Sequence, residues 1–172
     1  MATAMILDEL QRVMTAIDTE RTREFVAALA AADQVFVTGQ GRSGLVAAAF
    51  AVRLAQIGKS AHIAGAAATP PIAKGAVLVA CSGSGHTRTT LLHAEQAASA
   101  GAQVWGVTQD QSSSLALAAT HTICIPATSS AQPGASLFEQ TLFLFLDGVI
   151  IQLMSQLGET AETMLARHAN LE

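Results

Sequence analysis

Residues 77–87, VLVACSGSGHT, join an apolar run to a short run of glycines and small hydroxyl-bearing residues. The apolar part, within 76–82, is typical of a buried strand, and 86–101 is typical of a helix that ends at a glycine. The stretch VFVTGQGRSG at 35–44 repeats this order of strand, glycine turn and helix. Two such units in one chain are typical of a parallel α/β sheet.

Strand-like and helix-like segments alternate along the rest of the chain. The segments expected to be strands are 34–38, 60–65, 76–82, 102–108 and 120–126. The segments expected to be helical are 1–32, 43–58, 86–101, 112–120 and 136–158. The segment 66–75 is expected to be a connector, because Pro70 and Pro71 prevent a regular helix. We therefore predict an α/β protein with a single domain over 1–172, built on a doubly wound five-stranded parallel sheet flanked by helices.

The composition favours a protein that buries part of its surface in an oligomer. Hydrophobic residues make up 51% of the chain and charged residues 13%, which is apolar for a monomer. No apolar run reaches the roughly 18 residues of a membrane span, so no membrane partner is expected. Cys81 and Cys124 both lie within expected strands. We interpret them as buried free thiols in a reducing compartment, which predicts a cytoplasmic location.

The charge distribution favours an anion as ligand. The net charge of -4 argues against a nucleic-acid partner. Residues 34–94 contain no Asp or Glu but five Lys or Arg residues, so this window carries +5 and the remainder -9. Such a window arises by chance in some chains of low charge. The alternative is a pocket for an anion, in which nearby carboxylates would be unfavourable.

The two glycine turns have the chemistry of a phosphate site. Ligands of open α/β sheets bind at the carboxyl ends of the strands, where the N-termini of the helices offer free N–H groups. Glycine lets an anion approach the backbone, and hydroxyl groups add hydrogen-bond donors. The alternative is that the serines only cap a helix, but capping needs one such residue and the second turn has three hydroxyls. The residues expected to bind a phosphate are Gly41, Ser43, Ser82, Gly83, Ser84, Gly85 and Thr87.

A dinucleotide site is the rival interpretation of the first turn. Gly39, Gly41 and Gly44 match the G-x-G-x-x-G fingerprint in a strand–helix context. The fingerprint also requires an acidic residue about 20 positions later to hold the ribose, and 34–94 contains none. The chain also lacks the GxxxxGK[ST] motif of P-loop proteins. We therefore expect no cofactor.

The same residues carry a family resemblance. GQGRSG at 39–44 followed by SGSGHT at 82–87 resembles the sugar isomerase (SIS) domain family, whose members bind phosphosugars. Within it, the 6-phospho-3-hexuloisomerases are similar over nearly the whole chain, at AVRLAQIG (51–58), TPPI (69–72), SLFEQTLFLFLDGVI (136–150) and RHANLE (167–172).

The resemblance implies a reaction and an assembly. Such enzymes interconvert D-arabino-3-hexulose 6-phosphate and D-fructose 6-phosphate through an enediol(ate), in the ribulose monophosphate pathway of formaldehyde fixation. They require neither a metal nor a redox cofactor. The resemblance also implies a homotetramer with sites where subunits meet, and a tail, 159–172, that completes a site.

The resemblance also gives roles to individual side chains. Glu139 is the candidate base, although Ser136 and Glu139 also match a capping box, which alone would explain both. His168 would shuttle protons or help to open the sugar ring, and Arg42 would stabilise the enediolate or bind the phosphate. Thr69 would contact the sugar, although a plain turn is an equal alternative.

Other functions remain open at this level. The resemblance allows an arabinose 5-phosphate type of isomerase, or a non-catalytic SIS protein that senses phosphosugars. His86 and His93 share a helix face, but no acidic residue lies near them in the sequence, so no metal site is expected. Ala66 stands where related enzymes often have a glutamate, which puts any role of that glutamate in doubt.

Overall fold

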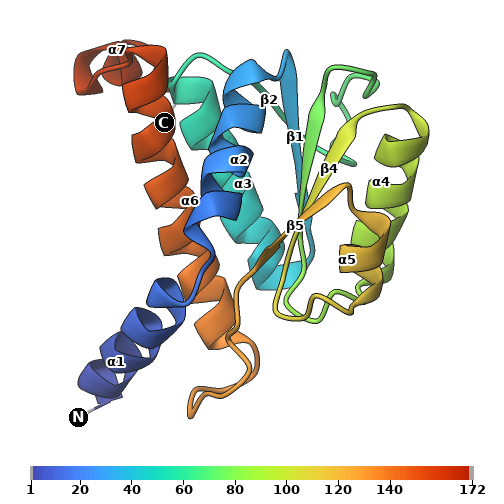
Figure 1. Ribbon diagram of the computed structural model, residues 1–172. Coiled ribbons are helices and arrows are strands. Elements are labelled where there is room, and N and C mark those ends of the chain that lie inside the picture. The colour runs from blue at the N-terminus through green and yellow to red at the C-terminus, as the bar shows by residue number, and fades with distance from the viewer. Residues whose placement is uncertain (1, 171–172) are drawn as a thin grey trace.

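The computed structural model describes residues 2–170 (Figure 1). The strands are β1 Gln34–Gly39, β2 Ser60–Ile63, β3 Val77–Cys81, β4 Gln103–Thr108 and β5 His121–Cys124. The helices are α1 Ala2–Thr15, α2 Thr19–Ala31, α3 Gly41–Gln56, α4 Arg88–Ser99, α5 Ser114–Ala118, α6 Ser136–Leu157 and α7 Ala161–Ala166.

The five strands form one parallel sheet in the order β2-β1-β3-β4-β5. The chain turns outward from β1 to β2 and then returns to place β3 on the other side of β1. The carboxyl ends of β1 and β3 are therefore the point where the winding reverses, which is where open α/β sheets bind ligands. The predicted fold class, a doubly wound five-stranded parallel sheet flanked by helices, is confirmed.

Helices cover both faces of the sheet (Figure 1). The larger core lies between the sheet and helices α1, α2, α3 and α6, and includes Phe25, Leu54 and Phe138. The smaller core lies under α4 and α5 and includes Phe36 and Leu115. Burial of such side chains stabilises by roughly 1.5–3 kcal/mol each, so the sheet is held from both sides.

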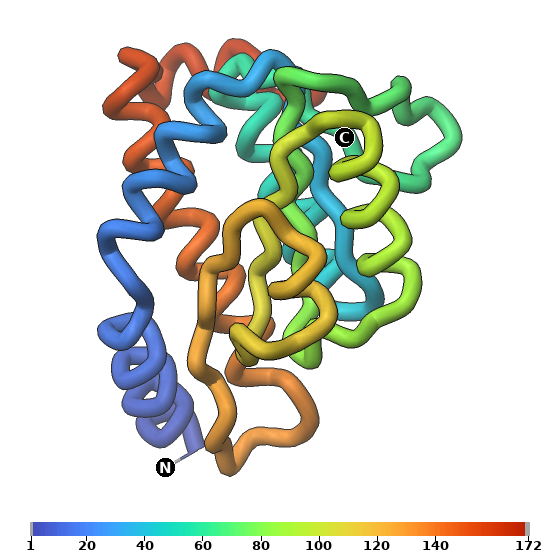
Figure 2. The backbone as a smooth tube through the Cα atoms, turned by 45° about the vertical axis from the view of Figure 1, so that its right-hand side comes forward, coloured from blue at the N-terminus to red at the C-terminus, as the bar shows by residue number. Residues whose placement is uncertain are grey.

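The N-terminal helical segment is two helices rather than one. The break falls at Asp18, whose Oδ1 accepts hydrogen bonds from the amides of Glu20 (2.9 Å) and Arg21 (3.1 Å). The Asp18 side chain thus caps the N-terminus of α2. A new helix therefore begins here, although the apolar spacing of the sequence continues through this point. Figure 2 shows that α1 extends away from the sheet and lies beside the loop that precedes α6.

Several expected boundaries shift at the carboxyl edge of the sheet, and three of these shifts affect the glycine turns or the loop after β2. Helix α3 begins at Gly41, two residues earlier than expected, and α4 begins at Arg88, after the turn rather than within it. Strand β2 ends at Ile63, because Gly65 with φ +85° turns the chain. The segment 64–76 contains no helix or strand, as its two prolines predict.

Helix α6 is the one helix within residues 2–170 that is long and apolar enough to cross a membrane. Half of its most apolar window is buried inside the protein. It packs against α1, α2 and α3, and its buried side chains, such as Leu142 and Leu153, belong to the larger core. Its apolar character is thus largely explained by this packing.

Candidate active site

Two glycine turns lie side by side at the carboxyl edge of the sheet, since Gly39 at the end of β1 pairs with Cys81 at the end of β3. A Cβ on Gly44 would lie 2.6 Å from the Gly39 carbonyl oxygen, so α3 approaches β1 too closely for any other residue. The G-x-G-x-x-G spacing therefore has a packing cause here. It needs no dinucleotide to explain it.

The turn 82–87 is a hydrogen-bonded loop built around Ser82. The Ser82 side chain is 3% exposed, and its Oγ accepts a hydrogen bond from the Gly85 amide at 3.1 Å. The Ser82 and Thr87 hydroxyl oxygens are 2.9 Å apart. Gly85 has φ +66°, and a Cβ there would overlap the side chain of Ser113. Ser82 thus shapes the turn from the inside, and Gly85 is required by both its backbone angle and its surroundings.

Ser84 and His86 form the outer surface of this turn. Ser84 is exposed, and its Oγ accepts a hydrogen bond from the His86 amide at 3.2 Å. The His86 ring is held by Ser114, with Nδ1 and Oγ 3.0 Å apart. Helix α4 begins directly after Thr87, so the N–H groups of its first turn and its positive dipole end lie at this loop. Ser43 lies in the matching first turn of α3, where its side chain is buried.

Arg42 and Glu139 form an ion pair across the site, from Arg42 Nε to Glu139 Oε2. The Arg42 side chain is 64% exposed and that of Glu139 12% exposed. The capping box that would otherwise explain Glu139 does not form. Helix α6 is capped by Ala135 without a side-chain bond, and the Ser136 hydroxyl donates to the Pro133 carbonyl at 2.7 Å. The Glu139 carboxylate is therefore directed to Arg42.

The start of α6 contacts both glycine turns. Glu139 reaches the first turn through Arg42. Phe138, which is fully buried, lies against the second turn, where a Cβ on Gly83 would be 3.0 Å from its ring. A carboxylate, a guanidinium, several hydroxyls and two helix N-termini therefore converge at one edge of the sheet. This set can bind an anion and exchange a proton beside it.

Thr69 lies on the loop that follows β2, and its hydroxyl has a local partner. Thr69 Oγ1 donates to the Ile63 carbonyl at 2.6 Å, and the Thr69 amide donates to the Ala66 carbonyl at 3.0 Å. Residues 66–68 are exposed alanines. The plain-turn alternative for Thr69 therefore has a structural basis, since the hydroxyl fixes the end of β2.

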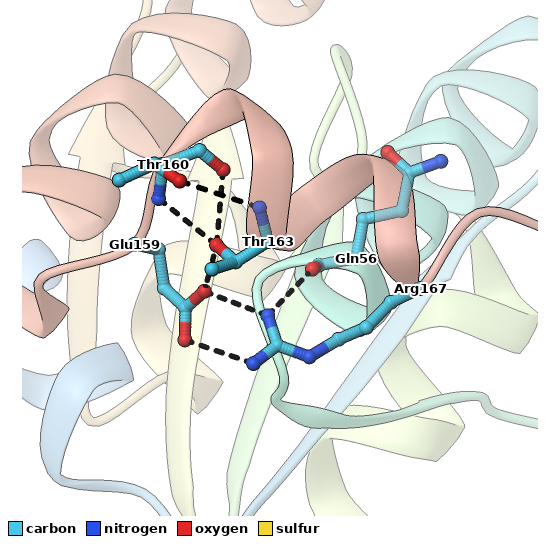
Figure 3. Close-up of polar contacts among 5 residues, drawn as sticks. All are labelled: Gln56, Glu159, Thr160, Thr163 and Arg167. Atoms are coloured by element: carbon cyan, nitrogen blue, oxygen red, sulfur yellow. Dashed lines mark hydrogen bonds and ion pairs between the residues drawn. The ribbon is translucent and has the colours of Figure 1, made fainter.

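His168 lies at the opposite end of α3 from the glycine turns. Arg167, the preceding residue, donates from Nη1 to Glu159 at 2.7 Å and to the Gln56 carbonyl at 3.1 Å (Figure 3). Residues 42–56 of a straight helix span about 21 Å. The structure thus brings Arg42 and Glu139 together, but it does not bring His168 to them within one chain.

The tail closes one end of a groove between α3 and α6. The groove holds a pocket of about 570 Å³. Its polar lining residues are Arg53, Gln56, Asp147, Arg167 and His168. The apolar part of its lining includes Val52 and Phe143, which are exposed.

Two contacts at this edge were not foreseen from the sequence. His93 of α4 is hydrogen-bonded to Thr38 of β1, with Nδ1 and Oγ1 2.7 Å apart. Glu9 of α1 accepts hydrogen bonds from the Ala131 amide (2.8 Å) and the Gln132 side chain (2.9 Å), which lower the Glu9 pKa. The partners are more than 50 and 120 residues apart. No local sequence pattern therefore predicts either contact.

The cysteines and histidines show no further cluster. Cys81 is fully buried, and burial raises the pKa of its thiol to about 12, which keeps it protonated and unreactive. Cys124 is also a free thiol, but it is half-buried rather than buried as expected, because it ends the edge strand β5. Over residues 2–170, no three His, Cys, Asp or Glu side chains gather where they could hold a metal ion.

Comparison with known proteins places this site in a family. The SIS domain model matches residues 28–165, so the chain belongs to the SIS domain family. The 3-hexulose-6-phosphate isomerase of Bacillus subtilis is 39% identical, over 98% of this chain and 96% of its own length. That of Mycobacterium gastri is 36% identical, over 98% and 89%. The chain is accordingly an isomerase.

Solved structures agree with the fold. A hypothetical protein of Methanococcus jannaschii, whose structure infers a molecular function of 3-hexulose-6-phosphate isomerase, superposes with a TM-score of 0.91 at 26% identity. The superposition covers 99% of each chain. A second similar structure, a hypothetical protein, has a TM-score of 0.88 at 32% identity and covers 96% of this chain and 93% of its own.

Proposed function

We propose that this isomerase interconverts D-arabino-3-hexulose 6-phosphate and D-fructose 6-phosphate. The observation that carries the proposal is the Arg42–Glu139 pair beside the serine-glycine turn, which sets a carboxylate next to an anion site. The names of the relatives from Bacillus subtilis and Mycobacterium gastri support the substrate. The Glu139 side chain is not used to cap α6, because Ala135 is the N-cap residue of that helix and no side chain bonds there.

The 6-phosphate binds at the turn 82–87. The exposed hydroxyl of Ser84 and the hydroxyl of Thr87 donate to it, together with N–H groups of the first turn of α4. Gly83 and Gly85 allow the phosphate to approach the backbone, and Ser82 keeps the loop in shape. Gly41 extends the same surface from the first turn, where the Ser43 side chain itself is buried. Of the other positive residues in the acid-free window 34–94, Arg88 begins α4 at this edge, whereas Lys59 donates to the carbonyls of Ala30 and Ala32 at the opposite edge of the sheet.

Glu139 moves the proton between the two carbons. Towards fructose 6-phosphate, its carboxylate removes the C2 proton of the hexulose. The C–H electron pair forms the C2–C3 double bond, and the C3 carbonyl oxygen becomes the enediolate oxygen. The proton then returns at C3, and the proton of the C2 hydroxyl passes to the C3 oxygen, so that C2 becomes the ketone and C3 carries the hydroxyl. Arg42 stabilises the oxyanion, and a charged donor aimed at such an oxygen is worth about 10²–10³ in rate.

The complete enzyme is a homotetramer, and His168 acts in the site of a neighbouring subunit. Two features of the chain support this. The tail contacts α3 at Gln56, whereas Arg42 lies in the first turn of that helix, and residues 42–56 of a straight helix span about 21 Å. Large apolar side chains remain exposed on α3 and α6, including Leu45 (72%) and Ile151 (68%). A surface of this kind is suited to a subunit contact.

The proposed setting is the cytoplasm, in the ribulose monophosphate pathway of formaldehyde fixation. The two free cysteines support a reducing compartment. The substrate of the forward reaction is the product of an aldol condensation that joins formaldehyde to a pentulose phosphate. The names of the relatives support this place in metabolism.

A substrate comparison tests the proposal. Fructose 6-phosphate and arabinose 5-phosphate are each incubated with the protein in chelator-treated buffer and followed by ¹³C NMR. We expect a C3 ketone signal from fructose 6-phosphate and no turnover of arabinose 5-phosphate. Turnover of arabinose 5-phosphate alone would assign the chain to the other type of isomerase. Binding of fructose 6-phosphate without turnover would indicate a sensor.

A further inference from the structure

His93 connects three segments that meet at the carboxyl edge of the sheet. It lies on α4, the helix that begins at the serine-glycine turn. Its Nδ1 is 2.7 Å from Oγ1 of Thr38, which is 2% exposed. Its ring lies against Gly65, at the start of the loop 64–76, where an added Cβ would be 3.5 Å from Cε1. One imidazole thus contacts the end of β1 and the loop after β2 from α4.

The bond to Thr38 fixes the first glycine turn against the second. Thr38 is the last residue before the Gly39–Gly41 turn, and Arg42 follows that turn directly. Helix α4 continues directly from the turn 82–87, because Thr87 is its N-cap residue. The Thr38–His93 bond therefore helps to set where Arg42 lies relative to the anion site. The pairing of Gly39 with Cys81 holds the ends of β1 and β3 together, and the His93 bond adds a side-chain restraint from α4.

The contact with Gly65 reaches the other side of the same edge. The loop 64–76 and α4 enclose an apolar pocket of about 210 Å³, lined by Phe36, Ile72 and Leu78 as well as His93. Gly65 has φ +85°, so this position combines a left-handed backbone with a close ring contact. His93 is the imidazole that closes the pocket towards Thr38.

We propose that His93, acting through Thr38, is a positioning residue of the isomerase site, and that it keeps Arg42 in place for the reaction. The inference rests on the proposed function. It gives a use to a histidine that lies outside the residues proposed to bind the phosphate or to act on the reacting carbons. A shift of about 1 Å in a positioned group costs up to about 10² in rate, so loss of the bond should be visible in kcat.

The test compares two pairs of variants in the fructose 6-phosphate assay. Thr38→Val keeps the shape and removes the hydroxyl, whereas Thr38→Ser keeps the hydroxyl. His93→Leu removes the ring nitrogen, whereas His93→Asn places an amide near the Nδ1 position. We expect Thr38→Val and His93→Leu each to lower kcat about tenfold with KM changed less than about threefold. Thr38→Ser and His93→Asn should recover most of the loss. Circular dichroism at the assay temperature confirms that each variant is folded.

A third variant separates positioning from general loss of structure. If Thr38 acts through Arg42, then Thr38→Val should change kcat less than about twofold in an Arg42→Gln background. A full tenfold loss in that background would overturn the inference, and so would normal kcat in Thr38→Val and His93→Leu. Wild-type protein that does not turn over fructose 6-phosphate would overturn the proposed function as well. The activity of the wild-type protein thus distinguishes failure of the positioning role of His93 from failure of the proposed function.

Discussion

Arg42 and Glu139 join the first turn of α3 to the first turn of α6, although they are 97 positions apart in the sequence. The pair is asymmetric, since the arginine is mostly exposed and the glutamate mostly buried. An incoming anionic substrate can therefore attract Arg42 without opening the core. In that event the Glu139 carboxylate is left facing the substrate, which is the arrangement that a base requires.

Glu139→Gln tests the base directly. The amide keeps the size of the side chain but accepts no proton, so kcat should fall by at least about a hundredfold. Binding of fructose 6-phosphate, measured by calorimetry, should change little. Glu95→Gln, on the exposed side of α4, is the matched control and should be fully active. Unchanged turnover in Glu139→Gln would reject the assignment.

Arg42→Gln separates the chemical role of the ion pair from its structural role. The Arg42 side chain is 64% exposed, and ion pairs at such positions contribute about 0–1 kcal/mol to stability. The midpoint of urea unfolding should therefore move little, while kcat falls about 10²-fold. Arg42→Lys should retain part of the activity because it keeps the charge but loses the planar donor set. A large loss of stability with normal kcat would contradict this view of the pair.

Gly85→Ala should damage the anion site more than a comparable change elsewhere. Both Gly85 and Gly134 have positive φ, but only Gly85 has a neighbour, Ser113, in the path of an added Cβ. Alanine at positive φ costs about 1–2 kcal/mol at either position. The additional clash should weaken fructose 6-phosphate binding at least tenfold in Gly85→Ala alone. Equal affinity in both variants would show that the anion binds elsewhere.

The tail should detach at low pH. The hydrogen bonds from Arg167 and Thr163 lower the Glu159 pKa below its usual value of 4.5. The group therefore stabilises the folded tail above about pH 4.5, and this contribution is lost as the pH falls through the lowered pKa. The hydrogen-exchange protection factors of residues 161–168, which correct for the intrinsic pH dependence of exchange, should fall over that range. Glu159→Gln should show fast exchange already at pH 7, and slow exchange in this variant would contradict the role of Glu159.

The sequence predicts the sheet and both glycine turns because local patterns determine them. Strand runs, glycine turns and helix stops at Gly58, Gly101 and Gly158 recur in the structure, where all three have positive φ. The absence of the capping box at Ser136 could not be foreseen. The start of α6 depends on the loop before it, and Glu9 of α1 holds that loop from more than 120 positions away.

The same limit applies to the partners of individual site residues. The contact of His93 with Thr38 depends on how α4 is rotated on the sheet, which apolar periodicity fixes only roughly. The resemblance to a family suggested His168 as a site residue, but no local pattern shows that Arg167 ties it to the far end of α3. Long-range packing decides which of the candidate residues meet.

Solvent deuterium exchange tests the central claim most directly. Fructose 6-phosphate is incubated with the protein in heavy water without added metal, and the sugar is followed by NMR. The account predicts deuterium at C3 of fructose 6-phosphate, together with the appearance of 3-hexulose 6-phosphate, and neither signal with Glu139→Gln. Bound fructose 6-phosphate that keeps its C3 proton in the wild-type protein would contradict the enediolate route and the role of Glu139.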